Sequence, residues 1–237
     1  MLTGYMYPYY FDWTYILIII GMVLALMAQA KVKSTFSRFA KVYSKRGITA
    51  AEAADMILRS NGIYDVNIEH VSGNLTDHYD SRDKTLRLSD STYNSTSVAA
   101  IGVAAHECGH AIQHAEHYAP LNIRSALVPV ANIGANISWP LILIGVLFSW
   151  NSVLINIGII MFCAAVAFQL VTLPVEYNAS NRAISIIESQ GILYGEEVGQ
   201  ARKVLSAAAL TYLAAAAASV LQLLRLVILF GGRRRND

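Results

Sequence analysis

Four apolar segments constrain the fold of this chain more than any other feature of its sequence. They lie at residues 13–30, 127–150, 153–174 and 205–230. A helix needs about 20 predominantly apolar residues to cross the hydrocarbon core of a bilayer, and each segment is close to or above that length. The chain is 55% hydrophobic and only 14% charged, whereas about a quarter of the residues of a soluble domain are charged. The sequence therefore predicts a mainly α membrane protein with three or four transmembrane helices.

The first apolar segment predicts an uncleaved anchor whose N-terminus lies outside the cell. Aromatic residues typical of a membrane interface crowd its N-terminal side; they are Tyr5, Tyr7, Tyr9, Tyr10, Trp13 and Tyr15. Basic residues follow the segment instead of preceding it, which is the wrong order for a signal peptide. These basic residues are Lys31, Lys33, Arg38, Lys41, Lys45 and Arg46. By the positive-inside rule they place the next part of the chain in the cytoplasm.

The second and third apolar segments predict a transmembrane hairpin. Their connection is very short and uncharged, so the chain would leave the cytoplasmic side and return to it. We expect interhelical hydrogen bonds from Asn132, Asn136 and Ser138, and a kink at Pro140.

The fourth apolar segment is compatible with two arrangements. Arg225 within it and the arginines at 233–235 after it favour a cytoplasmic C-terminus, with the helix lying along the cytoplasmic face. Burial of a long apolar helix outweighs this charge bias, however. We therefore favour a spanning helix with its tail outside and with Arg225 snorkelling to the outer interface.

Residues 31–126 are soluble in character and predict a small α+β domain. Thr49 and Glu52 form a capping box at the start of an amphipathic helix that Gly62 ends. Alternating or β-prone stretches predict strands at 66–71, 75–80 and 85–89, the last two joined as a hairpin around a turn at 81–84. A substrate strand could add to the edge of this hairpin at 86–89.

An HExxH motif, His106-Glu107-Cys108-Gly109-His110, lies inside an apolar run that predicts a helix. Residues four apart share one face of a helix, so both histidines can point at one Zn²⁺ ion. Glu107 beside them can polarise a zinc-bound water that attacks a peptide carbonyl. The alternative is a polar patch on a partly exposed helix, but unpaired polar groups in so apolar a run would be costly.

Such a site needs a third protein ligand. His114 lies roughly 12 Å along the helix from the first histidine, too far to share its ion. The metzincin pattern is absent, because Gln113 and Glu116 stand where it needs glycine and histidine. The predicted hairpin holds no aspartate of the kind that site-2-type intramembrane proteases use. Glu176 remains, opening a helix behind Pro174, and the alternative is an ordinary solvated glutamate at a helix start.

Five stretches of the chain, which include the HExxH motif and Glu176, together resemble the YugP-type membrane zinc metallopeptidases, a bacterial family distantly similar to HtpX-type gluzincins. The matching stretches are LTDHYD at 75–80, LRLS at 86–89, AAHECGHAIQ at 104–113, TLPVE at 172–176 and AAALTY at 207–212. The resemblance implies a membrane-anchored, zinc-dependent endopeptidase with a zincin-like protease domain. It also implies that His106, His110 and Glu176 bind the zinc and that Glu107 is the base.

One position departs from the gluzincin pattern. Gluzincins often place an aspartate four residues after the glutamate ligand, where it orients a histidine, and this chain has Ser180 there. Asn178, Asn181 or Asp77 could supply the orienting acceptor instead.

Further polar residues are candidates for contacts with substrate or lipid. His78 or Tyr79 could stabilise the developing oxyanion, or could simply form the polar end of a strand. Arg124 and Arg182 could bind a substrate carboxylate or a lipid headgroup, and we favour the headgroup.

We interpret the chain as a multi-pass zinc metallopeptidase of the bacterial plasma membrane with a cytoplasmic catalytic domain. Its predicted parts are an anchor at 1–30, the zincin-like domain at 31–126, the hairpin at 127–174, a cytoplasmic helix with the third ligand at 175–204, and a final helix and basic tail at 205–237. Its expected partners are the lipid membrane and protein or peptide substrates near it, with a membrane-protein partner or self-association left open. No basic and aromatic pattern of a nucleic-acid reader is present.

Two other functions compete with this interpretation. A non-proteolytic zinc-binding scaffold would not need Glu107 as a base. A transporter would need more helices or an inverted repeat than this chain offers.

Overall fold

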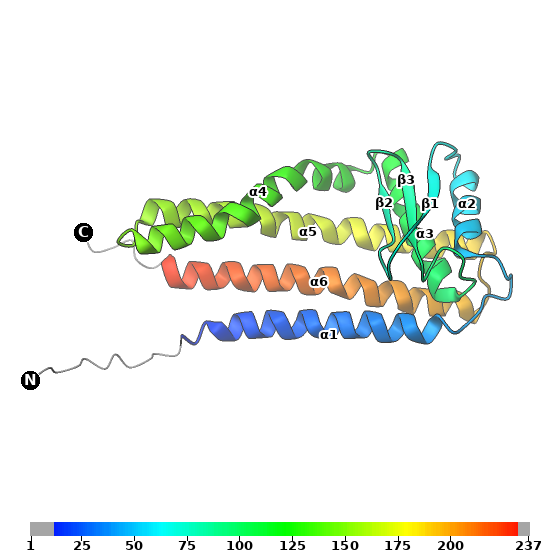
Figure 1. Cartoon of the computed structure of the whole chain (residues 1–237), viewed down its shortest axis with the longest axis horizontal. Coiled ribbons are helices and arrows are strands. Elements are labelled where there is room, and N and C mark those ends of the chain that lie inside the picture. Colours follow the sequence, from blue (N-terminus) through cyan, green and yellow to red (C-terminus); the bar gives the residue numbers. More distant parts are fainter. Residues whose placement is uncertain (1–11, 232–237) are drawn as a thin grey trace, which may run out of the picture.

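The computed structural model describes residues 12–231, and helices dominate it (Figure 1). The helices are α1 (Tyr15–Phe39), α2 (Ala50–Ser60), α3 (Val98–Ala115), α4 (Ala119–Leu147), α5 (Ser152–Ser189) and α6 (Glu196–Phe230). The strands are β1 (Asn67–Val71), β2 (His78–Asp80) and β3 (Thr85–Ser89). The predicted mainly α membrane protein with a small sheet is confirmed.

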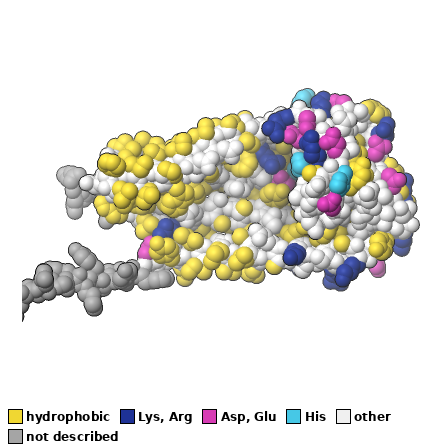
Figure 2. Space-filling model, viewed as in Figure 1, with side chains coloured by type: hydrophobic (Ala, Val, Ile, Leu, Met, Phe, Trp, Pro, Cys, Tyr) yellow, Lys and Arg dark blue, Asp and Glu magenta, His cyan; other side chains and the backbone are white. Residues whose placement is uncertain are grey.

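Within residues 12–231, the four helices α1, α4, α5 and α6 are long and apolar enough to cross a membrane. They run side by side, and the sheet with α2 and α3 lies at one end of them (Figure 1). Hydrophobic side chains gather over the opposite end, whereas most charged side chains lie around the sheet (Figure 2). The interfacial tyrosines at 5, 7, 9 and 10 and the arginines at 233–235 fall outside the described residues.

The fourth apolar segment packs along the first, so α6 is part of the bundle (Figure 1). Arg225 lies near the C-terminal end of α6 and is only 8% exposed, and its snorkelling to the outer interface stays a prediction. Its Nη2 atom lies 3.2 Å from Asp12 Oδ2, and its guanidinium stacks on the ring of Tyr15. This ion pair lies at the end of the bundle where α1 begins, and the Asp12 side chain is 28% exposed.

The long helices continue without a break from their apolar parts into the domain. Glu176 therefore does not open a helix behind Pro174, as predicted, but lies in the middle of α5. Proline lacks the amide hydrogen for one helical hydrogen bond, yet helices in membranes tolerate it when neighbouring helices support the backbone. As a result one continuous helix carries Glu176 from the membrane part of the bundle to the domain.

Close backbone packing joins α4 and α5, in place of the predicted interhelical hydrogen bonds. Gly158 lies against the carbonyl of Ser138, where an added Cβ would approach the oxygen to 2.9 Å. The Ser138 hydroxyl donates to the carbonyl of Ala135 in its own helix, and Asn132 and Asn136 are exposed. Glycine at the contact lets the two backbones approach, as small residues do between helices in membranes.

The sheet has the order β1-β3-β2. β2 and β3 form the predicted antiparallel hairpin, and β1 pairs with β3 in parallel. Residues 86–89 are therefore central and cannot accept a substrate strand, which makes the predicted docking edge wrong. Leu86 and Leu88 are buried on one face of β3 and Thr85 and Ser89 on the other, as suits a central strand. The free edges belong to β1 and β2.

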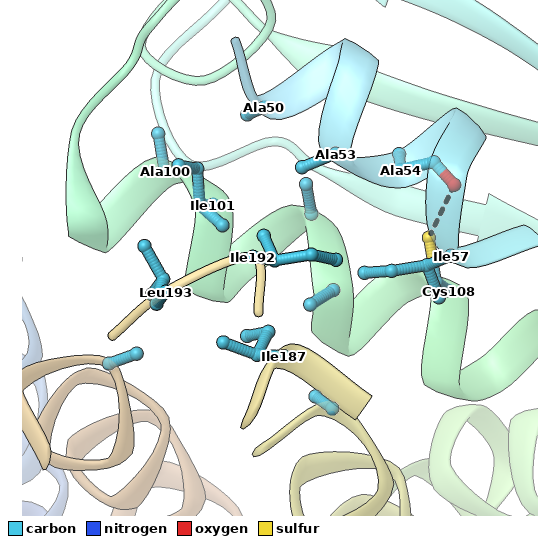
Figure 3. Close-up of a cluster of buried hydrophobic side chains, with 14 of the residues drawn as sticks. Ala50, Ala53, Ala54, Ile57, Ala100, Ile101, Cys108, Ile187, Ile192 and Leu193 are labelled. Carbon is cyan, nitrogen blue, oxygen red and sulfur yellow. Dashed lines mark hydrogen bonds between the residues drawn. The ribbon is translucent and has the colours of Figure 1, made fainter. Parts of the chain in front are cut away.

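The core of the domain lies between α2, α3 and the connection from α5 to α6 (Figure 3). Ile57, Ile101 and Leu193 belong to this core and are at most 1% exposed. The predicted capping box of Thr49 and Glu52 is present at the start of α2. This core holds α3 in place, and α3 carries the HExxH motif. Cys108 and Cys163 are both free thiols.

Candidate metal centre

His106 and His110 project from one face of α3, one turn apart. Their ring centroids are 4.7 Å apart, and their side chains are 13% and 12% exposed. Glu176 reaches the same point from α5, and its side chain is only 2% exposed. Its Oε2 atom lies 3.2 Å from Nε2 of His106 and 3.5 Å from Nε2 of His110. One potential ligand atom of each residue lies within 4.8 Å of the others.

The chemistry of these donors fits Zn²⁺. Two imidazole nitrogens and one carboxylate form the His₂Glu set that catalytic zinc sites use, with a fourth position left for water or substrate. The three residues come together because α3 and α5 touch at Gly109. A Cβ on this glycine would lie 2.6 Å from the carbonyl oxygen of Ala179, so a larger residue would keep the two ligand-bearing helices apart.

Glu107 lies beside the three candidate ligands and is 9% exposed. Its Oε2 atom accepts a hydrogen bond of 3.0 Å from the backbone amide of Tyr79 in β2. Burial raises the pKa of the Glu107 carboxyl, while His106 and His110 act in the opposite direction. A raised pKa moves a carboxylate towards the neutral range in which a general base works best.

Both histidines have a polar partner behind them. The Ser180 hydroxyl lies 3.1 Å from Nδ1 of His106, at the position where gluzincins often have aspartate. Nδ1 of His110 lies 3.0 Å from the side-chain oxygen of Gln113, a residue that was not predicted to belong to the site. Gln113 lies three residues after His110, so the helical period could have indicated it. Asp77 instead accepts hydrogen bonds from Ser89.

His78 and Tyr79, the two predicted candidates for stabilising the oxyanion, line a cavity beside the cluster, but their side chains have other partners. The hydroxyl of Tyr79 is 2.9 Å from Nδ1 of His114, and burial raises the pKa of Tyr79 to about 12. The ring of His78 is exposed, and its Nδ1 bonds to the carbonyl of Thr76. Tyr79 contacts Glu107 through its backbone amide and not through its hydroxyl.

A cavity of about 720 Å³ opens beside the cluster between β2, α4 and α6. Arg124 and Tyr212 line it together with Glu107, His110 and Glu176. Nη1 of Arg124 lies 3.3 Å from Oε1 of Glu176, so Arg124 belongs to the site, while its contact with a lipid headgroup stays a prediction. Tyr212 ends one of the stretches that resemble the family, but nothing in its local pattern indicated a role.

Arg182, for which we also favoured a lipid headgroup, has partners within the protein. Its Nη2 atom forms an ion pair of 2.7 Å with Glu116, and its Nε atom donates to Asn178. Arg182 thus joins α5 to the C-terminal end of α3, next to the cluster.

Comparison with known proteins also indicates a zinc peptidase. Residues 14–231 match the protein family described as "Putative neutral zinc metallopeptidase". The chain is also similar to the protein named "Putative membrane protease YugP" of Bacillus subtilis (strain 168). The two are 49% identical over 221 residues, which cover 93% of this chain and 98% of that protein. No solved structure matches the chain.

Proposed function

The chain belongs to the neutral zinc metallopeptidase family, and from this premise we propose that it hydrolyses peptide bonds of protein or peptide substrates at the membrane surface. His106, His110 and Glu176 hold the zinc in this proposal, and Glu107 is the general base. The convergence of these three side chains within 4.8 Å, from helices far apart in the sequence, is the observation that carries it.

Zn²⁺ held by these residues supplies a Lewis acid that polarises a carbonyl and lowers the pKa of water. Glu107 takes the proton from the attacking water and later gives it to the leaving amine. The backbone amide of Tyr79 holds the carboxylate in position for this transfer. A buried carboxylate beside two histidines would be costly to keep for a purely structural zinc site, which argues against the scaffold alternative.

The free edge of β2 is the proposed place for the substrate backbone. His78, Tyr79 and Asp80 line the cavity. The outward amide of Tyr79 already donates to Glu107, so a substrate strand would pair with the other backbone groups of this edge. An extended peptide that adds to this edge would lie across the candidate zinc ligands. The β2 edge replaces the edge predicted at residues 86–89, because β3 is the central strand of the sheet.

Substrates close to the bilayer fit the walls of the cavity. Leu121 and Val128 of α4 form one apolar wall, and Arg82 and Asp80 lie on the other side. Because α4 is one of the helices that can cross a membrane, the cavity lies where the bundle meets the domain. We propose the plasma membrane as the location and its cytoplasmic face for the domain. Lys31, Lys33 and the basic residues after them lie between the first apolar segment and the domain, and the positive-inside rule favours the cytoplasm for such residues.

The test compares Glu107→Gln with the wild type in proteolysis of an unfolded protein such as casein, using purified protein in detergent. Glutamine keeps the size of the side chain but cannot take the proton, so we expect full zinc content and activity reduced by about 100-fold or more. Glu188→Gln is the matched control, because Glu188 is exposed on α5. Wild-type turnover by Glu107→Gln would exclude Glu107 as the base. Zinc-loaded wild type that cleaves nothing would favour the scaffold.

A further inference from the structure

Gln113 is fully buried and connects the HExxH helix to the helix that carries Glu176. Its Oε1 atom lies 3.0 Å from Nδ1 of His110. Its Nε2 atom lies 2.9 Å from the carbonyl oxygen of Val175 and 2.9 Å from Oδ1 of Asn178. A side chain with no exposed area that fills three hydrogen bonds has one strongly preferred orientation.

Two independent contacts determine which end of the Gln113 amide faces His110. The carbonyl of Val175 can only accept a hydrogen bond, so the Gln113 atom next to it must be the nitrogen. Asn178 leads to the same result. Nε of Arg182 donates to Asn178 at 2.8 Å, and arginine has no acceptor, so the Asn178 atom at this point is its oxygen. That oxygen requires a donor from Gln113.

The orientation of the amide then determines the tautomer of His110. With Nε2 of Gln113 used by Val175 and Asn178, only its oxygen faces the imidazole, and Nδ1 of His110 must carry the hydrogen. The lone pair of the neutral ring is then on Nε2, which is the nitrogen 3.5 Å from Oε2 of Glu176. The corresponding partner of His106 is the Ser180 hydroxyl, which can donate or accept and so determines no tautomer.

We propose that Gln113 is a positioning residue that holds His110 as its Nδ1–H tautomer and so sets the zinc affinity of the site. This inference rests on the proposed function, because it assigns Nε2 of His110 to the metal. The same amide also holds the turn of α5 next to Glu176 through Val175. One side chain thus orients a ligand on α3 and anchors the helix that brings the third ligand.

The experiment measures zinc affinity, by competition with a chelator, for Gln113→Met and Gln113→Glu. Methionine has a similar length but offers no acceptor for Nδ1–H, so we expect affinity to fall by about 10- to 100-fold, as when groups that orient metal ligands are removed. In Gln113→Glu the new carboxyl can accept from His110. As the neutral acid that burial favours, it can also donate to Val175. We therefore expect this variant to recover most of the affinity.

A second measurement reports the tautomer without zinc. Imidazole nitrogen resonances of ¹⁵N-histidine-labelled, zinc-free protein should show a protonated Nδ1 at His110. The His110→Ala spectrum assigns the signals. In Gln113→Met this pattern should be lost. A bare Nδ1 at His110 in the wild type, or wild-type zinc affinity in a folded Gln113→Met, would overturn the inference.

If Gln113→Met does not fold, Asn178, which accepts a hydrogen bond from Gln113, provides the same test. Asn178→Asp keeps the acceptor for Gln113 and should keep the affinity, whereas Asn178→Leu removes it and should weaken binding. Equal affinity of these two variants would contradict the inference. Failure of the wild type to bind zinc would instead contradict the proposed function, and the spectrum of the zinc-free protein would still report on Gln113.

Discussion

Replacing Gly109 by alanine should separate the two helices that carry the candidate zinc ligands. The added Cβ would lie 2.6 Å from the carbonyl oxygen of Ala179 and 3.2 Å from its Cα. An ordinary contact between carbon and a carbonyl oxygen is about 3.3 Å or longer. Because the obstacle is backbone and not a flexible side chain, α3 and α5 would have to move apart by roughly 0.7 Å.

A shift of this size is large for a metal site but moderate for the fold. Overpacking costs about 1–3 kcal/mol, while alanine is about 1 kcal/mol more favourable than glycine inside a helix. The net loss of stability should therefore lie between about 0 and 2 kcal/mol, and the protein should still fold. Zinc ligands, in contrast, tolerate departures of only about 0.2 Å. We expect zinc affinity to fall by about 10- to 100-fold and proteolysis by about 100-fold.

Gly102→Ala is the matched control, because Gly102 lies on the same helix two turns earlier. Its added Cβ would meet the methyl group of Ala201 at 3.4 Å, close to an ordinary contact, so stability and zinc affinity should stay near wild type or improve. The assay measures thermal unfolding, zinc affinity and casein hydrolysis for both variants in parallel. Wild-type zinc affinity and activity in Gly109→Ala would refute the argument that this backbone contact sets the geometry of the site.

Three further expectations concern the ligands, the cavity and the topology. Glu176→Ala should leave the purified protein without stoichiometric zinc, and full zinc content would exclude Glu176 as the third ligand. Tyr212→Phe removes the phenol of the cavity and should lower kcat by about 100-fold at unchanged zinc content if that hydroxyl stabilises the oxyanion; unchanged kcat would exclude that role. Cysteines introduced at Ser81 and Ser189 should react with an impermeant reagent only after permeabilisation, whereas a cleavable tag after Asp237 should be digested in intact cells. Labelling of both cysteines in intact cells together with protection of the tag would show that the topology is the reverse of the predicted one.

Features that depend on neighbours along the chain could be predicted from the sequence. Thr49 and Glu52 are three residues apart, so their capping box follows from the geometry of a single helical turn. His106 and His110 share a face for the same reason. The apolar segments predict membrane helices because length and hydropathy are local properties. Glu176 follows from the sequence only by elimination, because a site with two histidines needs a third ligand; in the structure it lies beside them.

Features that depend on how distant elements meet were decided by the tertiary structure alone. Strand patterns at 67–71 and 85–89 do not say that these two strands pair in parallel and leave β3 in the centre. The local pattern around Tyr212 gives no sign that it lines the cavity beside Glu107. The physical reason is that a helix or strand has a fixed internal repeat, whereas the crossing of two elements depends on contacts such as that between Gly109 and Ala179. Such contacts join residues that lie far apart along the chain, and no period in the sequence encodes them.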